Sequence, residues 1–247
     1  MGGGSGGGLA SGCGRGGLPT GLLARSVMAS GVARRYQLLV PAGHTGTTPM
    51  RLIFVFHGMG GDGDQIRSYF GFETEAAGEA LFVYPDGLVR LQGRTGWGVE
   101  DLPFFDAMVD DIAASYCVDR ERIFATGHSF GAYMSNQVAC ERGNMVRAIA
   151  VASGGLLGGT CAGPVAAWLE HGTTDATVPQ SQGLAARDHW LTANGCSTTA
   201  TPVTPSPCVT YDGCSVGHPV TWCSFQGGHY PLPAFGKQAI WDFLRAF

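Results

Sequence analysis

Residues 127–131 read Gly-His-Ser-Phe-Gly and match the pattern GxSxG. They lie between an apolar run at 122–126 (RIFAT) and a stretch compatible with a helix from Gly131 to about Glu141. In such a strand, turn and helix the glycines permit a tight turn that exposes the serine oxygen, and the helix N-terminus favours developing negative charge. The pattern therefore predicts that Ser129 is a nucleophile, although an ordinary glycine-bounded turn would give the same five letters.

A serine hydroxyl needs a base to remove its proton, so a histidine is required, and a carboxylate must orient that histidine. Where GxSxG has this context, the chain order is serine, acid, histidine. His229, in QGGHYP, follows the predicted last strand and precedes the C-terminal helix, so it is the predicted base. We expect His57 and His128 to adjoin the site. The remaining histidines are expected to be structural or on the surface, and none is spaced as a metal-ligand pair: His44, His171, His189 and His218.

Asp175, in HGTTDATVP, is the predicted acid because it follows the strand at 166–170 and lies between the serine and His229. Its alternative role is an Asx-type turn before Pro179. Asp188 falls within a predicted helix and Asp212 within a predicted hairpin, so both are placed less well.

A tetrahedral intermediate also needs hydrogen-bond donors for its oxyanion. One donor is predicted to be the backbone amide of Phe130, directly after the nucleophile, and the other that of Met59 in the loop HGMGG. The alternative is that this loop is only a flexible strand-to-helix connection, but its glycines permit close backbone approach.

The elements that must position these residues alternate along the chain. Strands are predicted at 34–40, 51–56, 81–84, 122–126, 146–152 and 166–170, with a hairpin at 208–223. Helices are predicted from the HGMGGDGD loop to about residue 80 and at 102–116, 131–141, 182–192 and 236–247, with Asp101 capping the second. This order predicts an α/β-hydrolase fold, with a mostly parallel central sheet, helices on both faces and no large lid. We expect one catalytic domain at 13–247 after a glycine/serine-rich tail or linker at 1–12.

Composition excludes several classes of protein. The 247 residues are 45% hydrophobic, only 14% are charged, and the formal net charge is -4. Basic residues form no run or face, so we expect no nucleic-acid partner. No stretch of 18 apolar residues exists to span a membrane, and the start MGGGSGGG lacks the apolar core of a signal peptide, so secretion would imply a signal already removed.

Eight cysteines without a CxxC pair indicate disulfides and an oxidising compartment. A hairpin with its turn near residues 215–217 would place Cys208 opposite Cys223, which leaves Cys196 to pair with Cys214. Three pairings of the other four cysteines stay open: Cys13, Cys117, Cys140 and Cys161.

With these motifs placed, the chain resembles the secreted feruloyl esterases and polyhydroxybutyrate-depolymerase-like enzymes of carbohydrate esterase family 1. The likeness covers most of the chain and runs through SGCG, RRYQLLVP, RLIFVFHGMGG, GWGVED, CVDRERIFATGHSFGAYMSNQVAC, EHGTTDATVP, NGC, YDGC and VTWCSFQGGHYPLP. The resemblance implies an α/β-hydrolase fold, no cofactor, and hydrolysis of the ester that joins ferulate or related hydroxycinnamates to arabinoxylan. It also implies that Ser129, Asp175 and His229 form the triad, and that the enzyme is secreted.

An apolar aromatic acyl group needs an apolar and aromatic cleft, and Trp97, Val178 and Tyr230 belong to segments that could reach it, although each could instead belong to the core. We expect a monomer that acts on hydroxycinnamoyl-esterified arabinoxylan or small aromatic esters. The alternatives are an acetylxylan esterase or a polyester depolymerase and, outside the enzymes, a carbohydrate-binding protein on a hydrolase fold.

Overall fold

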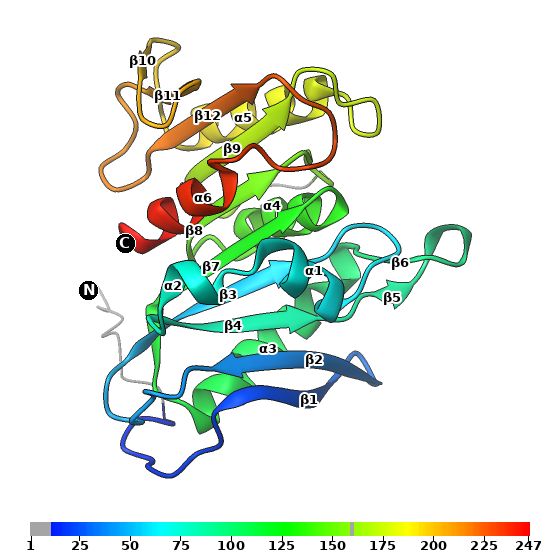
Figure 1. Cartoon of the computed structure of the whole chain (residues 1–247), viewed down its shortest axis with the longest axis vertical. Helices are drawn as coiled ribbons and strands as arrows, with labels where there is room; N and C mark the ends of the chain where they lie inside the picture. Colours follow the sequence, from blue (N-terminus) through cyan, green and yellow to red (C-terminus); the bar gives the residue numbers. More distant parts are fainter. Residues whose placement is uncertain (1–10, 159–160) are drawn as a thin grey trace, which may run out of the picture.

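A ten-stranded sheet forms the centre of the molecule in the computed structural model, which describes residues 11–158 and 161–247. Its strand order is β1-β2-β4-β3-β7-β8-β9-β12-β11-β10 (Figure 1). The strands from β4 to β12 in this order run parallel, and the two strands at each edge are antiparallel to their neighbours. The predicted α/β-hydrolase architecture with a mostly parallel sheet is therefore confirmed.

The strands of the main sheet are β1 (Gly21–Ala29), β2 (Val32–Val40), β3 (Met50–Phe56), β4 (Ala80–Pro85), β7 (Val118–His128), β8 (Val146–Ala152), β9 (Ala166–Gly172), β10 (Ala200–Pro202), β11 (Cys208–Tyr211) and β12 (Val220–Phe225). A separate ribbon pairs β5 (Leu88–Val89) with β6 (Thr95–Gly96). The helices are α1 (Gly63–Phe70), α2 (Glu73–Ala76), α3 (Leu102–Ser115), α4 (Phe130–Glu141), α5 (Gln180–Ala193) and α6 (Gly236–Arg245), and two short 3-10 turns lie at Leu91–Gly93 and Val99–Asp101.

Helices cover both faces of the sheet because its central strands are apolar on both sides. Along β3, Phe54 and Phe56 pack into the cluster that includes residues of α3, α4 and α5. The alternate residues Ile53 and Val55 pack into the cluster that includes residues of α1, α2 and α6. No helix among the described residues has the length and apolar composition to cross a bilayer.

Three local features differ from the sequence-based expectations. No strand was predicted at β1, which pairs with β2 alone among the described strands and is exposed along much of its length. The helix expected to reach residue 80 is broken at Gly71, whose left-handed φ of 59° ends α1. Asp101 does not cap α3 with its side chain, because its carboxylate pairs with Arg34 and Arg90 and accepts a hydrogen bond from the Gly98 amide.

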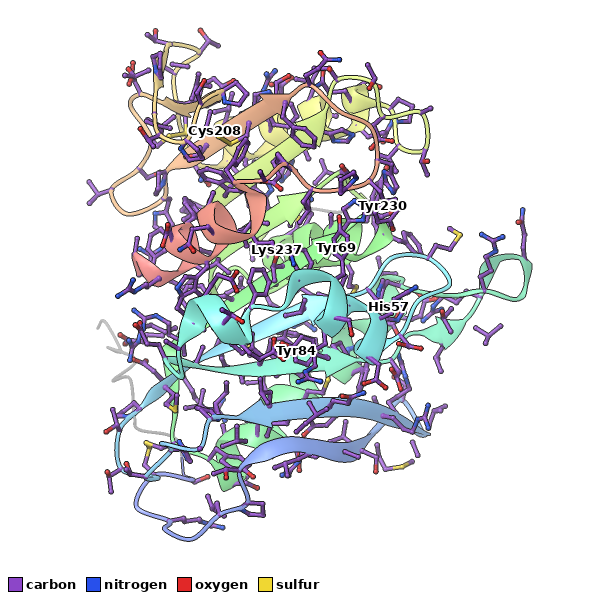
Figure 2. The ribbon with its side chains drawn as sticks, in the orientation of Figure 1. His57, Tyr69, Tyr84, Cys208, Tyr230 and Lys237 are labelled. Atoms are coloured by element: carbon purple, nitrogen blue, oxygen red, sulfur yellow. A yellow bond between two sulfur atoms is a disulfide. The ribbon has the colours of Figure 1, made fainter. Side chains whose placement is uncertain are left out.

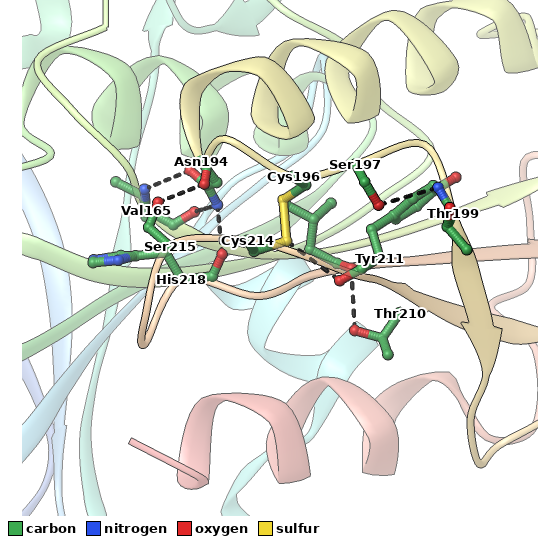
Figure 3. The surroundings of a disulfide bond; sticks show 11 residues. Val165, Asn194, Cys196, Ser197, Thr199, Thr210, Tyr211, Cys214, Ser215 and His218 are labelled. Carbon is green, nitrogen blue, oxygen red and sulfur yellow. Dashed lines mark hydrogen bonds between the residues drawn. A yellow bond between two sulfur atoms is a disulfide. The ribbon is translucent and has the colours of Figure 1, made fainter.

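The predicted C-terminal hairpin is confirmed. Cys208 on β11 lies opposite Cys223 on β12, and the two form a disulfide. Cys196 pairs with Cys214, as predicted. Figure 3 shows this second bridge beside Asn194, whose side chain hydrogen-bonds backbone groups of neighbouring segments.

The two pairings that the sequence left open are Cys13 with Cys117 and Cys140 with Cys161. The first ties the N-terminal segment to the residue before β7. Most of the predicted tail, residues 1–10, lies outside the described residues. At its end, the Gly12 amide donates to the carbonyl of Ala113 on α3 at 2.9 Å, and the domain boundary at residue 13 stays a prediction.

Candidate active site

The site lies where the parallel strands end. The last residues of neighbouring strands are in register, with Phe56 opposite Gly127, Gly127 opposite Val151, and Gly172 opposite Phe225. The loops after β3, β7, β9 and β12 therefore emerge at one edge of the sheet, which is where open α/β folds place their ligands. These four loops carry Met59, Ser129, Asp175 and His229.

Ser129 occupies a sharp turn between β7 and α4. Its φ of 59° and ψ of -124° are a backbone conformation that non-glycine residues rarely adopt. The turn requires glycine on both sides. A Cβ on Gly131 would lie 1.9 Å from the carbonyl oxygen of Phe56, and one on Gly127 would lie 2.5 Å from the carbonyl carbon of Gly131. The expectation that these two glycines permit a tight turn is confirmed.

The predicted acid and base are in contact. His229 Nδ1 lies 2.7 Å from Asp175 Oδ2, and both side chains are buried. Because an ionised carboxylate only accepts hydrogen bonds, Nδ1 carries the proton and donates it, which leaves Nε2 of the neutral ring as an acceptor. The other oxygen, Asp175 Oδ1, accepts from the amides of Thr177 at 2.9 Å and Val178 at 2.8 Å.

These contacts keep Asp175 ionised. Burial acts to raise the pKa of Asp175, but hydrogen bonds from His229 and from the amides of Val178 and Thr177 outweigh it, so the pKa lies below its ordinary value. His171 Nε2 lies 3.4 Å from Asp175 Oδ2 and donates to the Val178 carbonyl at 2.8 Å. From the sequence His171 was expected to be structural or on the surface, and the signal for a place in the site was its spacing of four residues from Asp175.

Ser129 lies in the same corner as this pair, although no hydrogen bond joins its Oγ to His229 in the described part of the chain. A Cβ on Gly58 would lie 3.5 Å from Ser129 Cβ and 3.7 Å from the hydroxyl oxygen of Tyr230, the residue after His229. Catalytic hydrogen bonds are often long before substrate binds and shorten in the complex.

His128 connects the turn at Ser129 with the loop that carries His229. Its Nε2 lies 2.8 Å from the carbonyl oxygen of His229, so the ring donates from Nε2. Burial and the nearby His229 lower the pKa of His128 to about 3. His128 is therefore neutral at ordinary pH and holds the backbone of the predicted base. The expectation that it adjoins the site is confirmed.

The two predicted oxyanion donors have no hydrogen-bond partner among the described residues. Neither the Met59 amide nor the Phe130 amide donates a hydrogen bond to a described residue. His57 fixes the loop that carries Met59: its Nε2 accepts from the Gly87 amide at 2.9 Å, so Nδ1 is the donor to the Gly58 carbonyl at 2.7 Å. Burial lowers the pKa of His57, which favours this neutral ring.

A cavity of about 210 Å³ opens beside this corner. Tyr230 is 58% exposed at its edge and packs on Tyr69, and Figure 2 shows both near the end of the sheet. Val178 is half-buried and touches the site through its backbone. Trp97 is only 2% exposed, and its Nε1 donates to the His57 carbonyl, so the expectation that its ring contacts substrate is not supported.

One buried carboxyl near the site was not singled out from the sequence. Glu170 on β9 is 1% exposed; its Oε2 accepts from Trp168 Nε1 at 3.2 Å, and its Oε1 has no partner among the described residues. A Cβ on Gly236, the first residue of α6, would lie 2.7 Å from that Oε1. Burial raises the pKa of Glu170 to about 7, opposed by the hydrogen bond from Trp168. A titratable group thus lies under the segment that links His229 to α6.

The described residues contain one cluster with the geometry of metal ligands: Cys140, Cys161 and His189. Both of its sulfur atoms form a disulfide, so neither is a thiolate, the form of cysteine that binds metals.

Solved structures share this architecture. The fold is similar to that of an acetyl xylan esterase from Aspergillus awamori, with a TM-score of 0.72, 16% identity, and coverage of 90% of this chain and 98% of that one. A ferulic acid esterase of carbohydrate esterase family 1, from Anaeromyces mucronatus, is also similar, with a TM-score of 0.61 and 14% identity. The match covers 95% of this chain and 93% of that one. The profile of the prolyl oligopeptidase family matches residues 90–157, which include Ser129. Fold and turn together define an α/β-hydrolase.

Relatives with similar sequences identify the family, which the fold alone does not. The chain is 34% identical to feruloyl esterase D of Neurospora crassa over 96% of this chain and 90% of that protein. It is 35% identical to feruloyl esterase C of Emericella nidulans, over 86% of this chain and 84% of that protein. The chain belongs to the feruloyl esterase family, and it is a serine hydrolase of carboxylic esters.

Proposed function

We propose that this enzyme releases ferulic or related hydroxycinnamic acids from esterified arabinoxylan or small aromatic esters, as a secreted monomer. The relatives named feruloyl esterases support the substrate class, and the four disulfides fit an extracellular enzyme. The observation that carries the proposal is the buried hydrogen bond between His229 and Asp175, next to the strained turn at Ser129.

In this proposal Ser129 attacks the ester carbonyl and passes its proton to His229 Nε2. Asp175 holds His229 in the required tautomer and stabilises the imidazolium that forms. His229 then protonates the leaving sugar oxygen, which leaves an acyl-enzyme on Ser129. Water, deprotonated by the same histidine, attacks this acyl group and frees the acid.

The amides of Met59 and Phe130 are proposed to hold the oxyanion in both steps. They flank Ser129 from the loops after β3 and β7, and neither donates to another described group. The aromatic ring of the acyl group is proposed to enter the 210 Å³ cavity lined in part by Ile66, Tyr69 and Tyr230. Apolar and aromatic walls with a few polar groups are typical of sites for small aromatic ligands.

The test is a substrate panel with detection of the released acid: methyl ferulate, feruloylated arabinoxylan, acetylated xylan and a short polyhydroxyalkanoate. We expect the highest kcat/KM on the feruloyl esters. Ser129→Ala should lower kcat by about 10⁴-fold or more, while Ser181→Ala on the exposed start of α5 should not. A higher kcat/KM on acetylated xylan would replace the proposed substrate, and a loss below tenfold in Ser129→Ala would reject the nucleophile.

A further inference from the structure

The β5–β6 ribbon projects from the edge of the sheet where the site lies (Figure 1). Two strands of two residues each are too short to be stable alone. The ribbon is instead fixed to the loop that carries Met59. The Gly60 amide donates to the Thr95 carbonyl at 2.8 Å, and Thr95 Oγ1 donates to the Gly61 carbonyl at 2.6 Å. A ligand that binds to the ribbon is therefore held at a fixed position relative to the site.

The ribbon carries one neutralised arginine and one that is not. The guanidinium of Arg90 forms ion pairs with Glu100 and Asp101, and its side chain is mostly buried. Arg94 is exposed and forms no ion pair within the described residues. Arg94 is thus an accessible positive charge on a protein whose formal net charge is -4.

Arg94 lies within reach of a polymer that is bound at the reacting serine. A Cβ on Gly60 would be 3.7 Å from Arg94 Cδ, and one on Gly58 would be 3.5 Å from Ser129 Cβ. Since successive Cα atoms are about 3.8 Å apart, the Arg94 Cδ lies within about 20 Å of Ser129. A polymer with its ester bond at Ser129 can reach this guanidinium.

The ribbon and the loop that carries Met59 also expose apolar side chains. Val89 is 67% exposed, Leu88 37% and Met59 44%. Apolar side chains exposed on a ribbon that is fixed beside the catalytic loop are accessible to a bound ligand. They offer contact to the C–H faces of sugar rings, while Arg94 requires an anionic group.

We propose that the β5–β6 ribbon binds the glycan part of the ester substrate and that Arg94 recognises a carboxylate on it, as on a uronic-acid side group. The proposal rests on the proposed function, because it assumes a glycan ester at Ser129. A guanidinium matches a carboxylate with two parallel hydrogen bonds, so the arginine selects this group over a neutral hydroxyl. The partner is therefore an acidic polysaccharide.

The test measures binding, so that it does not depend on ester turnover. Ser129→Ala protein is titrated with uronate-bearing xylan and with the same xylan after its carboxyls are reduced to alcohols. We expect the uronate-bearing polymer to bind roughly two- to fivefold more tightly at low ionic strength, as for an exposed ion pair. Adding Arg94→Gln should abolish this preference, and salt at about 0.5 M should suppress it.

Arg15→Gln is the matched control, because Arg15 is also exposed and has no ion pair among the described residues but precedes β1, far in sequence from the ribbon. It should keep the preference. Equal affinity of the Ser129→Ala protein for the two polymers would overturn the inference, and so would equal losses on both polymers in Arg94→Gln. If the substrate panel shows no feruloyl ester hydrolysis while the uronate preference is present, the proposed function fails and glycan recognition by Arg94 stands.

Discussion

Replacing Glu170 by glutamine should change how the stability of the protein depends on pH. The carboxyl is fully buried, one of its oxygens has no partner among the described residues, and burial raises its pKa from 4.5 to about 7. Glutamine has nearly the same shape and can accept the hydrogen bond from Trp168 Nε1, but it does not ionise. The substitution therefore isolates the contribution of the charge.

The direction in which the unfolding free energy changes with pH follows from the protonation of Glu170 in the folded and unfolded chains. Below pH 4.5 Glu170 is protonated in both chains, and the contribution of this group to the unfolding free energy is at its highest. Between pH 4.5 and 7 the unfolded chain releases a proton that the folded chain retains, so the unfolding free energy falls as pH rises. A shift from 4.5 to about 7 corresponds to a loss on the order of 3 kcal/mol, complete once the pH exceeds 7.

The measurement is the free energy of unfolding in guanidinium chloride at several pH values from 4 to 8.5, for wild type and Glu170→Gln. We expect wild type to lose about 3 kcal/mol relative to the variant across this range. Glu121→Gln, at an exposed position, serves as the control and should follow wild type. Parallel curves for wild type and Glu170→Gln would refute the reasoning, because they would mean that this carboxyl titrates alike in both states.

Three further changes test the site and its supports. Asp175→Asn should lower kcat by about 10²- to 10⁴-fold with unchanged far-UV circular dichroism, because the amide does not fix the His229 tautomer; near wild-type turnover would assign the acid elsewhere. Gly131→Ala should reduce the unfolding free energy by about 1–3 kcal/mol, since the new methyl group would overlap a carbonyl oxygen of β3, and an unchanged melting temperature would contradict this. Replacing both Cys208 and Cys223 by serine should cost about 3 kcal/mol of stability and lower turnover before global unfolding. Full activity of the double variant would show that the bridge does not position the base.

The parts of the site that depend on local backbone chemistry could be predicted from the sequence. Gly127 and Gly131 have to lie close to other backbone atoms, and that need is visible in the five-residue pattern itself. The bridge between Cys208 and Cys223 followed from hairpin register, since opposite residues on paired strands bring their Cβ atoms together.

What could not be predicted depends on partners far apart in the chain. Asp101 looked like a helix cap, but Arg34 and Arg90 draw its carboxylate into ion pairs, which no local pattern records. The sequence left Trp97 open between the cleft and the core, and the structure buries it, with its Nε1 donating to the carbonyl of His57. These contacts exist only after the sheet has formed.

The four disulfides determine which peptide bonds can be cut without loss of a fragment. The bridge from Cys13 to Cys117 encloses the β5–β6 ribbon, so a protease that cleaves this projecting segment leaves both pieces covalently joined. The segment from residue 224 to the C-terminus lies beyond the last bridge, at Cys223. One cut at the exposed Gln226 would leave His229 and α6 without a covalent link to the rest of the chain, held only by packing, hydrogen bonds and ion pairs. A cut in this loop should therefore inactivate the enzyme, whereas a nick in the ribbon should release no fragment.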